Sequence, residues 1–404
     1  LEKTLGIPLF QEQAMKIAIV AAGFSPHEAD ALRRALSTFR RFGDINKFEE
    51  RFISGMLRNG YELSFAERCF KQIEGFADYG FPESHAASFA LLVYISAWFK
   101  CHYPAAFSCA LLNSLPMGFY APAQLVRDVR DHSVEVRPMD INLSQWDCTL
   151  ENSDVAGFPA LRLGLRIIKG LKQSDVEILI EARNAPYQSV HDLWRRAGLG
   201  RATLECLARA DVFLSMGLTR RNALWEIKAM DDTPLPLFDF AERHEPNMTL
   251  PVMSLGEQVT DDYRALTLSL KSHPLALLRS NLNARNCVSA AELQYITHGA
   301  PVRLAGLVTS RQRPGSAKGV MFITLEDETG HANLIVWPNV FERFRRQILK
   351  TSLLEVTGEV LKEGLVIHVI SHWLQDLTPW LGHLGNASEK ILTIPLRDFK
   401  RSHQ

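Results

Sequence analysis

Apolar residues recur at helical spacing through the first 145 residues of the chain. Between residues 12 and 22 the chain is apolar at Met15, Ile17, Ala18, Ile19 and Val20, which indicates a helix. Ser25 followed by Pro26 is typical of a helix N-cap with proline in the first turn. The pattern therefore predicts a mostly helical region over residues 1–145. Further helices are expected near residues 46–59, 64–75, 85–100, 104–113 and 122–132, before an extended stretch from Pro138 to Asn142.

Two successive units of similar pattern follow in residues 146–230. The first joins Gly170-Leu171-Lys172 to a helix expected at 174–183, and the second joins Gly198-Leu199-Gly200 to a helix expected at 202–210. A glycine turn between two helices is typical of a helix-hairpin-helix motif. We therefore predict a tandem helix-hairpin-helix region.

The pattern changes twice more. Residues 231–300 begin with a stretch rich in proline and acids and then turn helical near 261–282, which predicts a linker and short helices. Residues 301–376 alternate with period two in five runs, with a helical stretch at 340–349 between the third and fourth. This order predicts an OB-fold β-barrel. Residues 377–404 form a tail with one strand-like stretch, 391–394. The predicted fold class is multidomain α+β.

Composition narrows the function classes. An apolar fraction of 47% excludes wholesale disorder, and 45 basic against 45 acidic residues exclude a global polycation. The six cysteines form no C-x-x-C pair, which indicates reduced core thiols, a cytoplasmic protein and no structural metal. The apolar run 86–99 is too short to cross a bilayer, so we expect a buried helix and no membrane partner. The chain opens on Leu1, as a piece of a larger protein would.

The hairpins are candidate phosphate sites. Residues 160–225 hold eleven basic and six acidic residues, a net charge of +5. Backbone N–H groups at a helix start bind phosphate without regard to base sequence. The alternative is a structural turn with glycine as a helix C-cap. The candidate DNA-binding residues are Lys169, Gly170, Lys172, Gly198, Gly200 and Arg201.

The barrel offers a second candidate DNA-binding surface. Its predicted face includes Arg303 and Phe322, and the basic loop 311–319 is expected to be exposed. Basic grooves with stacking aromatics hold single strands in such barrels. Phe322 and Trp337 could equally belong to the barrel core, and Arg343, Arg345 and Arg346 to a solvated helix face. The candidate DNA-binding residues of the barrel are Arg311, Arg313, Lys318 and Trp337.

Arginines also cluster in the first region, at Arg33-Arg34 and Arg40-Arg41. Arginine suits bidentate contact with phosphate, although surface arginines without a ligand are the alternative. Asp30 stands three and four residues before Arg33 and Arg34, so we expect it to pair with only one of them. Ser84 and His85 are expected to cap the apolar helix that follows them.

Long stretches of the sequence resemble the alpha subunits of bacterial DNA polymerase III, a C-family polymerase. They include LGIPLFQEQAMKIA, ADALRRALS, GFADYGFPESHAASFALLVYISAWFKCHYPAAFSCALLN, LRLGLRIIKGL and LKSHPL. AGLVTSRQRPGSAKGVMFITLEDETGHANLIVWPNVFERFR resembles the error-prone branch in particular. The resemblance implies a C-terminal fragment of an error-prone DNA polymerase used in translesion synthesis, with residues 1–145 as part of its fingers.

The resemblance also implies roles for single residues. Arg33 and Arg34 match fingers arginines that meet the triphosphate of the incoming nucleotide. Ser84 and His85 match a segment beside that pocket, where Glu83 replaces the usual lysine. The palm aspartates that bind metal precede the matched region, so we expect no catalytic residue, cofactor or polymerase activity here, and Mg²⁺ in the parent enzyme.

Partners follow from the same resemblance. These are DNA primer–template, a deoxynucleoside triphosphate, a sliding clamp and a Y-family-like polymerase relative. Residues 233–238 stand where replicative relatives carry a clamp-binding peptide, with Leu237 and Phe238 as its hydrophobic end, although a tucked linker is equally compatible. The rival function is a non-polymerase DNA-repair module that combines hairpins with a barrel, and a weaker one is an RNA-binding protein. A repair module would not need the fingers-like residues 1–145.

Overall fold

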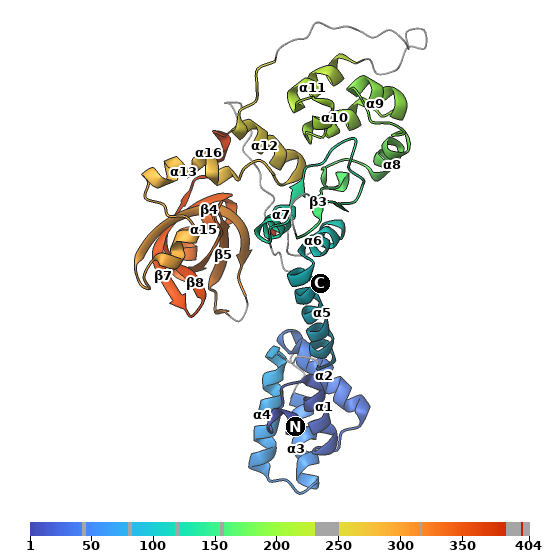
Figure 1. Ribbon diagram of the computed structural model, residues 1–404. Coiled ribbons are helices and arrows are strands. Elements are labelled where there is room, and N and C mark those ends of the chain that lie inside the picture. The colour runs from blue at the N-terminus through green and yellow to red at the C-terminus, as the bar shows by residue number, and fades with distance from the viewer. Residues whose placement is uncertain are drawn as a thin grey trace. The chain divides into compact units, whose positions relative to one another are not determined.

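The computed structural model describes residues 1–42, 46–79, 83–117, 121–153, 157–230, 250–314, 317–384 and 397–398. The chain divides into two compact units, Leu1–His102 and Tyr103–Gln404. Figure 1 colours the elements of both units in chain order and labels many of them.

The first unit is helical, as predicted. Ser25 caps α2 reciprocally, because its hydroxyl accepts from the Glu28 amide at 3.2 Å and its own amide donates to the Glu28 carboxylate at 2.7 Å. The ring of Phe52 packs between those of Phe24 and Phe70 in the core, with centroid distances of 6.1 Å to Phe24 and 5.6 Å to Phe70. The helices are α1 (Gln11–Val20), α2 (Pro26–Phe42), α3 (Asn46–Arg58), α4 (Leu63–Tyr79) and α5 (Glu83–His102), after a 3-10 turn at Glu2–Thr4.

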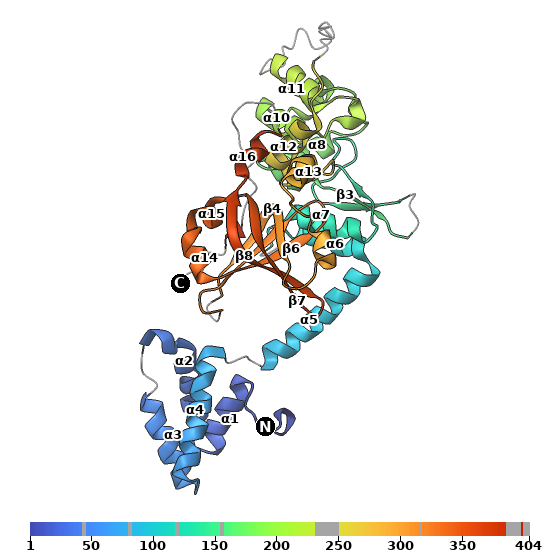
Figure 2. The same ribbon diagram turned by 90° about the vertical axis from the view of Figure 1, so that its left-hand side faces the viewer.

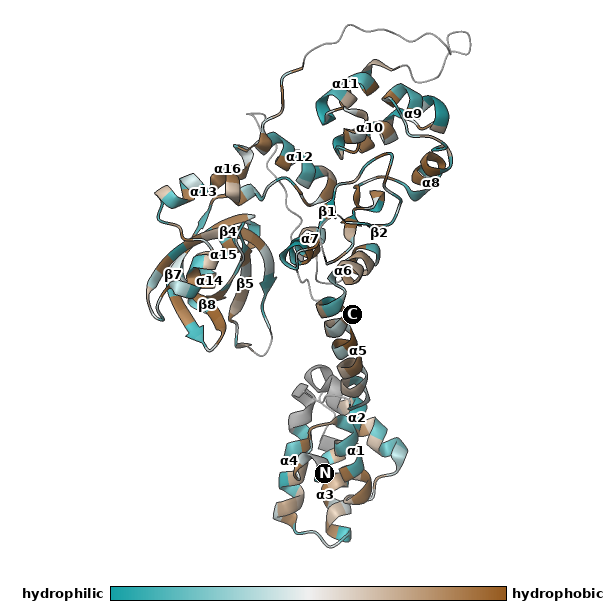
Figure 3. Ribbon diagram, in the orientation of Figure 1, coloured by the Kyte–Doolittle hydropathy of each residue, from teal (hydrophilic) through white to brown (hydrophobic). Residues whose placement is uncertain are grey.

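Helix α5 differs from expectation. It carries the apolar run along its length (Figure 3), yet none of its side chains is buried. Leu91, Val93 and Tyr94 are 62%, 64% and 73% exposed. The prediction of a buried helix is therefore wrong for the chain as it stands. The length and hydropathy of a helix indicate that its apolar side chains favour burial, but they do not show that other residues of this chain bury them.

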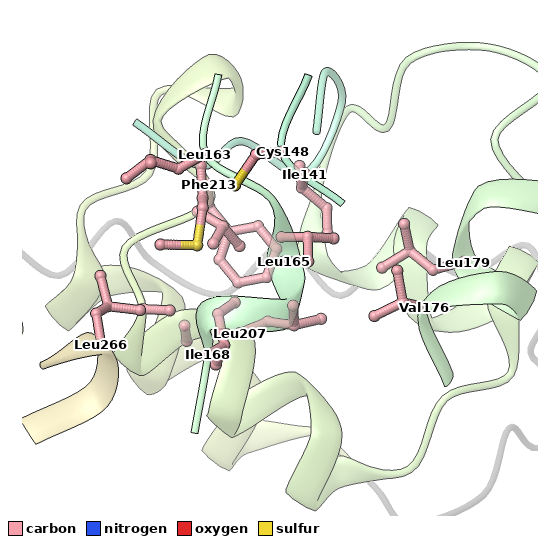
Figure 4. Packing of buried hydrophobic residues seen from close by; sticks show 14 of the residues in the cluster. Ile141, Cys148, Leu163, Leu165, Ile168, Val176, Leu179, Leu207, Phe213 and Leu266 are labelled. Carbon is pink, nitrogen blue, oxygen red and sulfur yellow. The ribbon is translucent and has the colours of Figure 1, made fainter. Parts of the chain in front are cut away.

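One core spans the helical part of the second unit (Figure 4). It runs from Ala105 to Leu268 and joins residues on both sides of position 145, so the predicted change of region there is not a break in the core. The helices around this core are α6 (Pro104–Asn113), α7 (Pro122–Asp131), α8 (Gln173–Glu181), α9 (Val190–Ala197), α10 (Arg201–Arg209) and α11 (Arg220–Ala229), with 3-10 turns at Leu165–Ile167 and Leu214–Met216. A small sheet beside them has the order β1 (Val136–Arg137), β3 (Ala160–Arg162), β2 (Thr149–Glu151).

Residues 250–300 contain two helices that bridge the hairpin region and the barrel. Helix α12 (Leu255–Leu266) and helix α13 (Pro274–Ala284) share a core with the outside of the barrel. Arg127 donates to the carbonyl of Asp327 at 2.7 Å, and Arg279 pairs with Asp327 at 3.0 Å. The part of the predicted linker that the structure describes is therefore an ordered connection.

The barrel is closed and has the predicted topology. Its strands follow the order β4-β5-β6-β8-β7, and β7 returns to β4. The pair β6–β8 is parallel and the other pairs around the ring are antiparallel. Two short helices stand between the third and fourth strands, where a single helical stretch was predicted. The elements are β4 (Pro301–Gln312), β5 (Met321–Glu326), β6 (His331–Val336), α14 (Pro338–Arg343), α15 (Arg345–Lys350), β7 (Leu353–Glu363) and β8 (Val366–Asp376), followed by α16 (Thr378–Gly382) and β9 (Arg397–Asp398).

Several smaller predictions can be compared with the structure. All six cysteines are free, and burial raises the pKa of Cys148 to about 11. Cys101 is exposed, so the expectation of a core thiol is wrong there. No helix within the described ranges is long and apolar enough to cross a membrane. The strand-like stretch 391–394 lies outside the described residues.

Candidate nucleic-acid interface

The second hairpin has the predicted geometry. Helix α9 ends at Gly198, which has φ +62° and is left-handed, a conformation that glycine adopts without steric cost. Leu199 is 4% exposed and anchors the turn in the core. Gly200 then serves as the N-cap of α10 in an extended conformation, with φ −67°. Gly198 is thus required by its backbone, whereas the backbone at Gly200 would accept any residue.

The first hairpin matches only in part. A single 3-10 turn, Leu165–Ile167, stands where a preceding helix was expected. Gly170 has φ +78° and is exposed, and Lys172 is the exposed N-cap of α8. The turn is therefore a glycine hairpin that leads into a helix, but strand β3 and the 3-10 turn replace its first helix.

The two helices that follow the hairpins begin without a side-chain cap, as do α6, α14, α15 and α16. Neither Lys172 at α8 nor Gly200 at α10 provides a side-chain cap. The other helices from α9 to α13 begin with a side chain that accepts a backbone hydrogen bond, namely Ser189, Thr219, Ser254 and His273. A bare helix start keeps its amide donors and its positive dipole end available to an anion. Sequence reasoning missed this contrast, although the residue types at the N-cap positions carry it.

The net charge of +5 over residues 160–225 is larger than the positive charge that this region exposes to solvent. Arg162 and Arg220 are buried, at 7% and 3% exposed, and form ion pairs with Glu151 and Asp262. Arg183 donates to two backbone carbonyls at 2.9 and 3.0 Å. These cations hold the fold together, and the +5 total is not a measure of what faces solvent. The basic residues that remain exposed include Lys172, Arg195, Arg201 and Arg209.

Lys169 also has a structural contact. Its backbone amide donates to the Ala265 carbonyl at 3.0 Å, and its ammonium donates to the Tyr263 carbonyl at 3.3 Å. Both carbonyls belong to the last turn of α12, where a cation is favourable. Burial lowers the pKa of Lys169. The structure thus shows Lys169 joining the first hairpin to α12, and its contact with DNA stays a prediction.

Arg33 and Arg34 lie on α2 and are both part-exposed, at 39% and 60% of their side chains. Arg33 pairs with one carboxylate oxygen of Asp30 at 2.9 Å, and Arg34 pairs with the other at 3.2 Å. The expectation that Asp30 could pair with only one of them is wrong, because the two oxygens take one arginine each. The hydrogen bond from Arg33 holds the pKa of Asp30 below its ordinary value. The side chains of Arg40 and Arg41 lie outside the described residues.

Ser84 and His85 lie inside α5, which begins at Glu83, so their predicted capping role is wrong. The amide of Glu83 instead donates to the Glu12 carboxylate of α1 at 2.9 Å. Both Ser84 and His85 are exposed, and the His85 ring lies 4.3 Å from that of Phe89.

The barrel candidates divide between interior and surface. Arg311 is 6% exposed and lies in β4, where its guanidinium donates to the Ile348 and Thr351 carbonyls. Its predicted place in an exposed DNA-binding loop is therefore wrong. Arg313 and Lys318 are exposed, and Trp337, the residue before α14, is 48% exposed. Phe322 is half-buried on the outer side of β5.

Three family models match separate parts of the chain. Residues 1–60 match the bacterial DNA polymerase III alpha subunit finger domain, and residues 133–223 match a helix-hairpin-helix motif. Residues 302–369 match an OB-fold nucleic acid binding domain. The order agrees with that of the helical unit, the hairpins and the barrel.

Curated relatives match the chain as a whole. Error-prone DNA polymerase 1 of Rhizobium meliloti is 54% identical, over 97% of this chain and 37% of that protein. The error-prone DNA polymerase of Ruegeria pomeroyi is 51% identical, over 98% and 36%. A solved asparaginyl-tRNA synthetase from Pyrococcus horikoshii is similar over 22% of this chain and 23% of its own, at 26% identity and a TM-score of 0.20, too low to support any conclusion.

The chain spans a little over a third of the length of these relatives. The prediction of an error-prone type rests on sequence stretches that extend into the barrel, and the relatives match over the same length. The chain therefore corresponds to part of an error-prone DNA polymerase of the bacterial DNA polymerase III alpha-subunit family, with which it is homologous along nearly its whole length.

Proposed function

We propose that this chain holds the primer–template and the incoming deoxynucleoside triphosphate for an error-prone DNA polymerase that copies damaged templates. The observation that carries this proposal is the match to error-prone polymerases over 97% of the chain, joined to two bare hairpin helices. Each hairpin would hold one backbone phosphate through the first amides of α8 and α10. Phosphate contacts of this kind fix position without reading bases.

The nucleotide site would use α2. Arg33 and Arg34 share Asp30, and both guanidinium groups retain solvent access. A triphosphate would compete with Asp30 for these arginines, because it carries more charge and accepts bidentate hydrogen bonds. Ser84 and His85, exposed at the start of α5, would lie beside the same pocket.

Catalysis would take place elsewhere in the full protein. Within the described ranges, no group of three or more His, Cys, Asp or Glu residues could hold a metal ion. Two-metal phosphoryl transfer needs acidic ligands, so the Mg²⁺ ions would bind in a palm that this chain does not include. The chain alone would then bind substrates without extending a primer.

Further partners are a sliding clamp and a Y-family-like polymerase relative. The segment proposed for the clamp, with Leu237 and Phe238, lies outside the described residues. The support for both partners is therefore the family resemblance alone.

Binding of the purified chain to a labelled primer–template tests the proposal. Between 50 and 500 mM salt, the two hairpin phosphates predict a log–log slope of about −2, and each further phosphate contact adds about −0.9. Two unrelated sequences should bind equally, because phosphate contacts do not read bases. A flat salt dependence, or a strong preference for one sequence, would contradict the proposal.

A further inference from the structure

The outer strand face of the barrel carries no lysine or arginine at its centre. Two rows of residues cross β5, β6 and β8 there, each alternating with buried core positions. One row is Phe322, Ile335 and Ile370, and the other is Thr324, Asn333 and His368. None of these six residues is a lysine or an arginine. A backbone phosphate would therefore find little attraction on this face.

The helical flank, which we define as α14, α15, Arg313 and Trp373, has the opposite character. Arg343, Arg345, Arg346 and Lys350 are exposed on the two helices, and Glu342 is the one acidic residue of that stretch. The pair between Glu342 and Arg345 is long, at 4.0 Å, and both side chains are more than 60% exposed. Such a pair neutralises little, so the flank keeps a surplus of positive charge.

The arginines of the flank lie over aromatic rings. The Arg313 guanidinium lies 4.8 Å from the centroid of Phe341, and the Arg345 guanidinium lies 6.0 Å from the same ring. The Arg343 guanidinium lies 5.2 Å from Phe344 and 5.3 Å from Trp373. Stacking of this kind restrains a flexible side chain before any ligand arrives.

Trp373 gives the flank an exposed aromatic plane. Trp373 belongs to β8, the strand that lies beside α14 and α15 (Figure 2). Its ring packs edge-on against that of Phe344, with centroids 5.0 Å apart. Nearly half of its surface, 49%, remains exposed beside Arg343. An exposed tryptophan next to an ordered arginine offers one base a stacking partner and one phosphate a cation.

We propose that single-stranded DNA binds the barrel along this helical flank, with Trp373 stacking on a base and Arg343 holding the adjacent phosphate. Arg313 and Arg345, on Phe341, hold a further phosphate. The inference rests on the proposed DNA-binding function and says which side of the barrel performs it. An acidic protein segment would also be attracted by the positive charge of the flank, but it carries no base that could stack on the ring of Trp373.

Two matched charge changes separate the flank from the strand face. Arg343→Gln lowers the net charge of the flank by one unit, and Asn333→Glu lowers the net charge of the strand face by one unit. Trp373→Leu keeps an apolar side chain but removes the stacking plane. Affinity of the full chain for a fluorescent 12-nucleotide oligo(dT) is measured by anisotropy, with thermal melting to establish that each variant folds. Photocrosslinking of 5-bromodeoxyuridine oligonucleotides then identifies the peptide in contact with the base.

Arg343→Gln and Trp373→Leu should each weaken oligo(dT) binding about 5- to 100-fold, and Asn333→Glu less than about twofold. The crosslink should fall in the peptide that contains Trp373. A loss with Asn333→Glu and none with Arg343→Gln would overturn the inference in favour of the strand face. The inference would also be overturned if Arg343→Gln weakens oligo(dT) binding, Trp373→Leu does not, and a polyglutamate peptide binds the chain as tightly as oligo(dT) does. That result would show a general anion-binding surface. If the unaltered chain binds primer–template but not oligo(dT), this inference alone fails. If the unaltered chain binds neither, the proposed function fails too.

Discussion

Replacing Gly200 by aspartate should stabilise the second hairpin but weaken phosphate binding at its proposed site. Gly200 is the N-cap of α10, with φ −67° and ψ 152°, and a Cβ atom there would meet nothing within 4 Å. Aspartate is a preferred N-cap residue, and its carboxylate would accept a hydrogen bond from the first turn of α10. The same carboxylate would occupy the amides that we assign to a phosphate, and would repel that phosphate.

The two effects have opposite signs. Aspartate in place of glycine at an N-cap adds a few tenths of a kcal/mol, and its charge at the positive helix end adds about 0.3–1 kcal/mol. The free energy of unfolding should therefore rise by roughly 0.5–1 kcal/mol. Charge-assisted hydrogen bonds to a phosphate are worth about 1.5–3 kcal/mol, so affinity for primer–template should fall roughly 10- to 150-fold.

The assay combines thermal melting with anisotropy on a labelled primer–template at fixed salt. Gly200→Ala is the control at the same site, since it adds no charge and no cap and should leave affinity nearly unchanged. Thr219→Asp is the control for charge, because it places the same carboxylate at α11, which already has a side-chain cap. If Gly200→Asp melts at or above the temperature of the unaltered chain and binds DNA equally well, the amides of α10 hold no phosphate.

Three further predictions follow from particular residues. In the full-length polymerase, Arg34→Ala should lower kcat/KM for nucleotide by about one to two orders of magnitude, and Arg34→Lys should restore part of that loss. If neither substitution changes kcat/KM in steady-state kinetics, Arg34 is only a surface partner of Asp30. Val93→Lys on α5 should change the unfolding free energy of this chain by less than about 0.5 kcal/mol, because Val93 is 64% exposed, and a loss of several kcal/mol on denaturant unfolding would show a buried helix. Asp262→Ala should cost about 3–5 kcal/mol in the same experiment, because it leaves the buried Arg220 charge without its nearest partner; a loss below 1 kcal/mol would mean that Asp211 and Asp261 suffice.

The elements of the fold follow from local pattern. Period two across residues 301–376 predicts five strands, and the closed barrel has them in that order with two helices between the third and fourth. Gly170 and Gly198 predict turns because only glycine adopts a positive φ without steric cost, and both have it. These features depend on residues close together in sequence, which is why sequence alone can predict them.

The roles of the arginines depend on distant residues instead. Arg220 pairs with Asp262, 42 residues away, and Arg311 donates to the Ile348 carbonyl, 37 residues away. A count of basic residues in a sequence window therefore cannot distinguish a buried, paired arginine from a solvent-exposed one. The same limit applies to Trp373, whose exposure follows from its position beside α14 and α15. Pattern also says that α5 is apolar, but not that its surface stays uncovered in this chain.

Primer extension separates substrate binding by this chain from nucleotide addition by the full-length polymerase. The chain alone and the full-length polymerase that contains it are compared with Mg²⁺ on an undamaged template and on one with an abasic site. We expect the full-length protein to extend the primer on both templates, whereas the chain alone should bind the primer–template but add no nucleotide. Extension by the chain alone would contradict the account, and so would a full-length protein that stops at every lesion or adds no nucleotide at all.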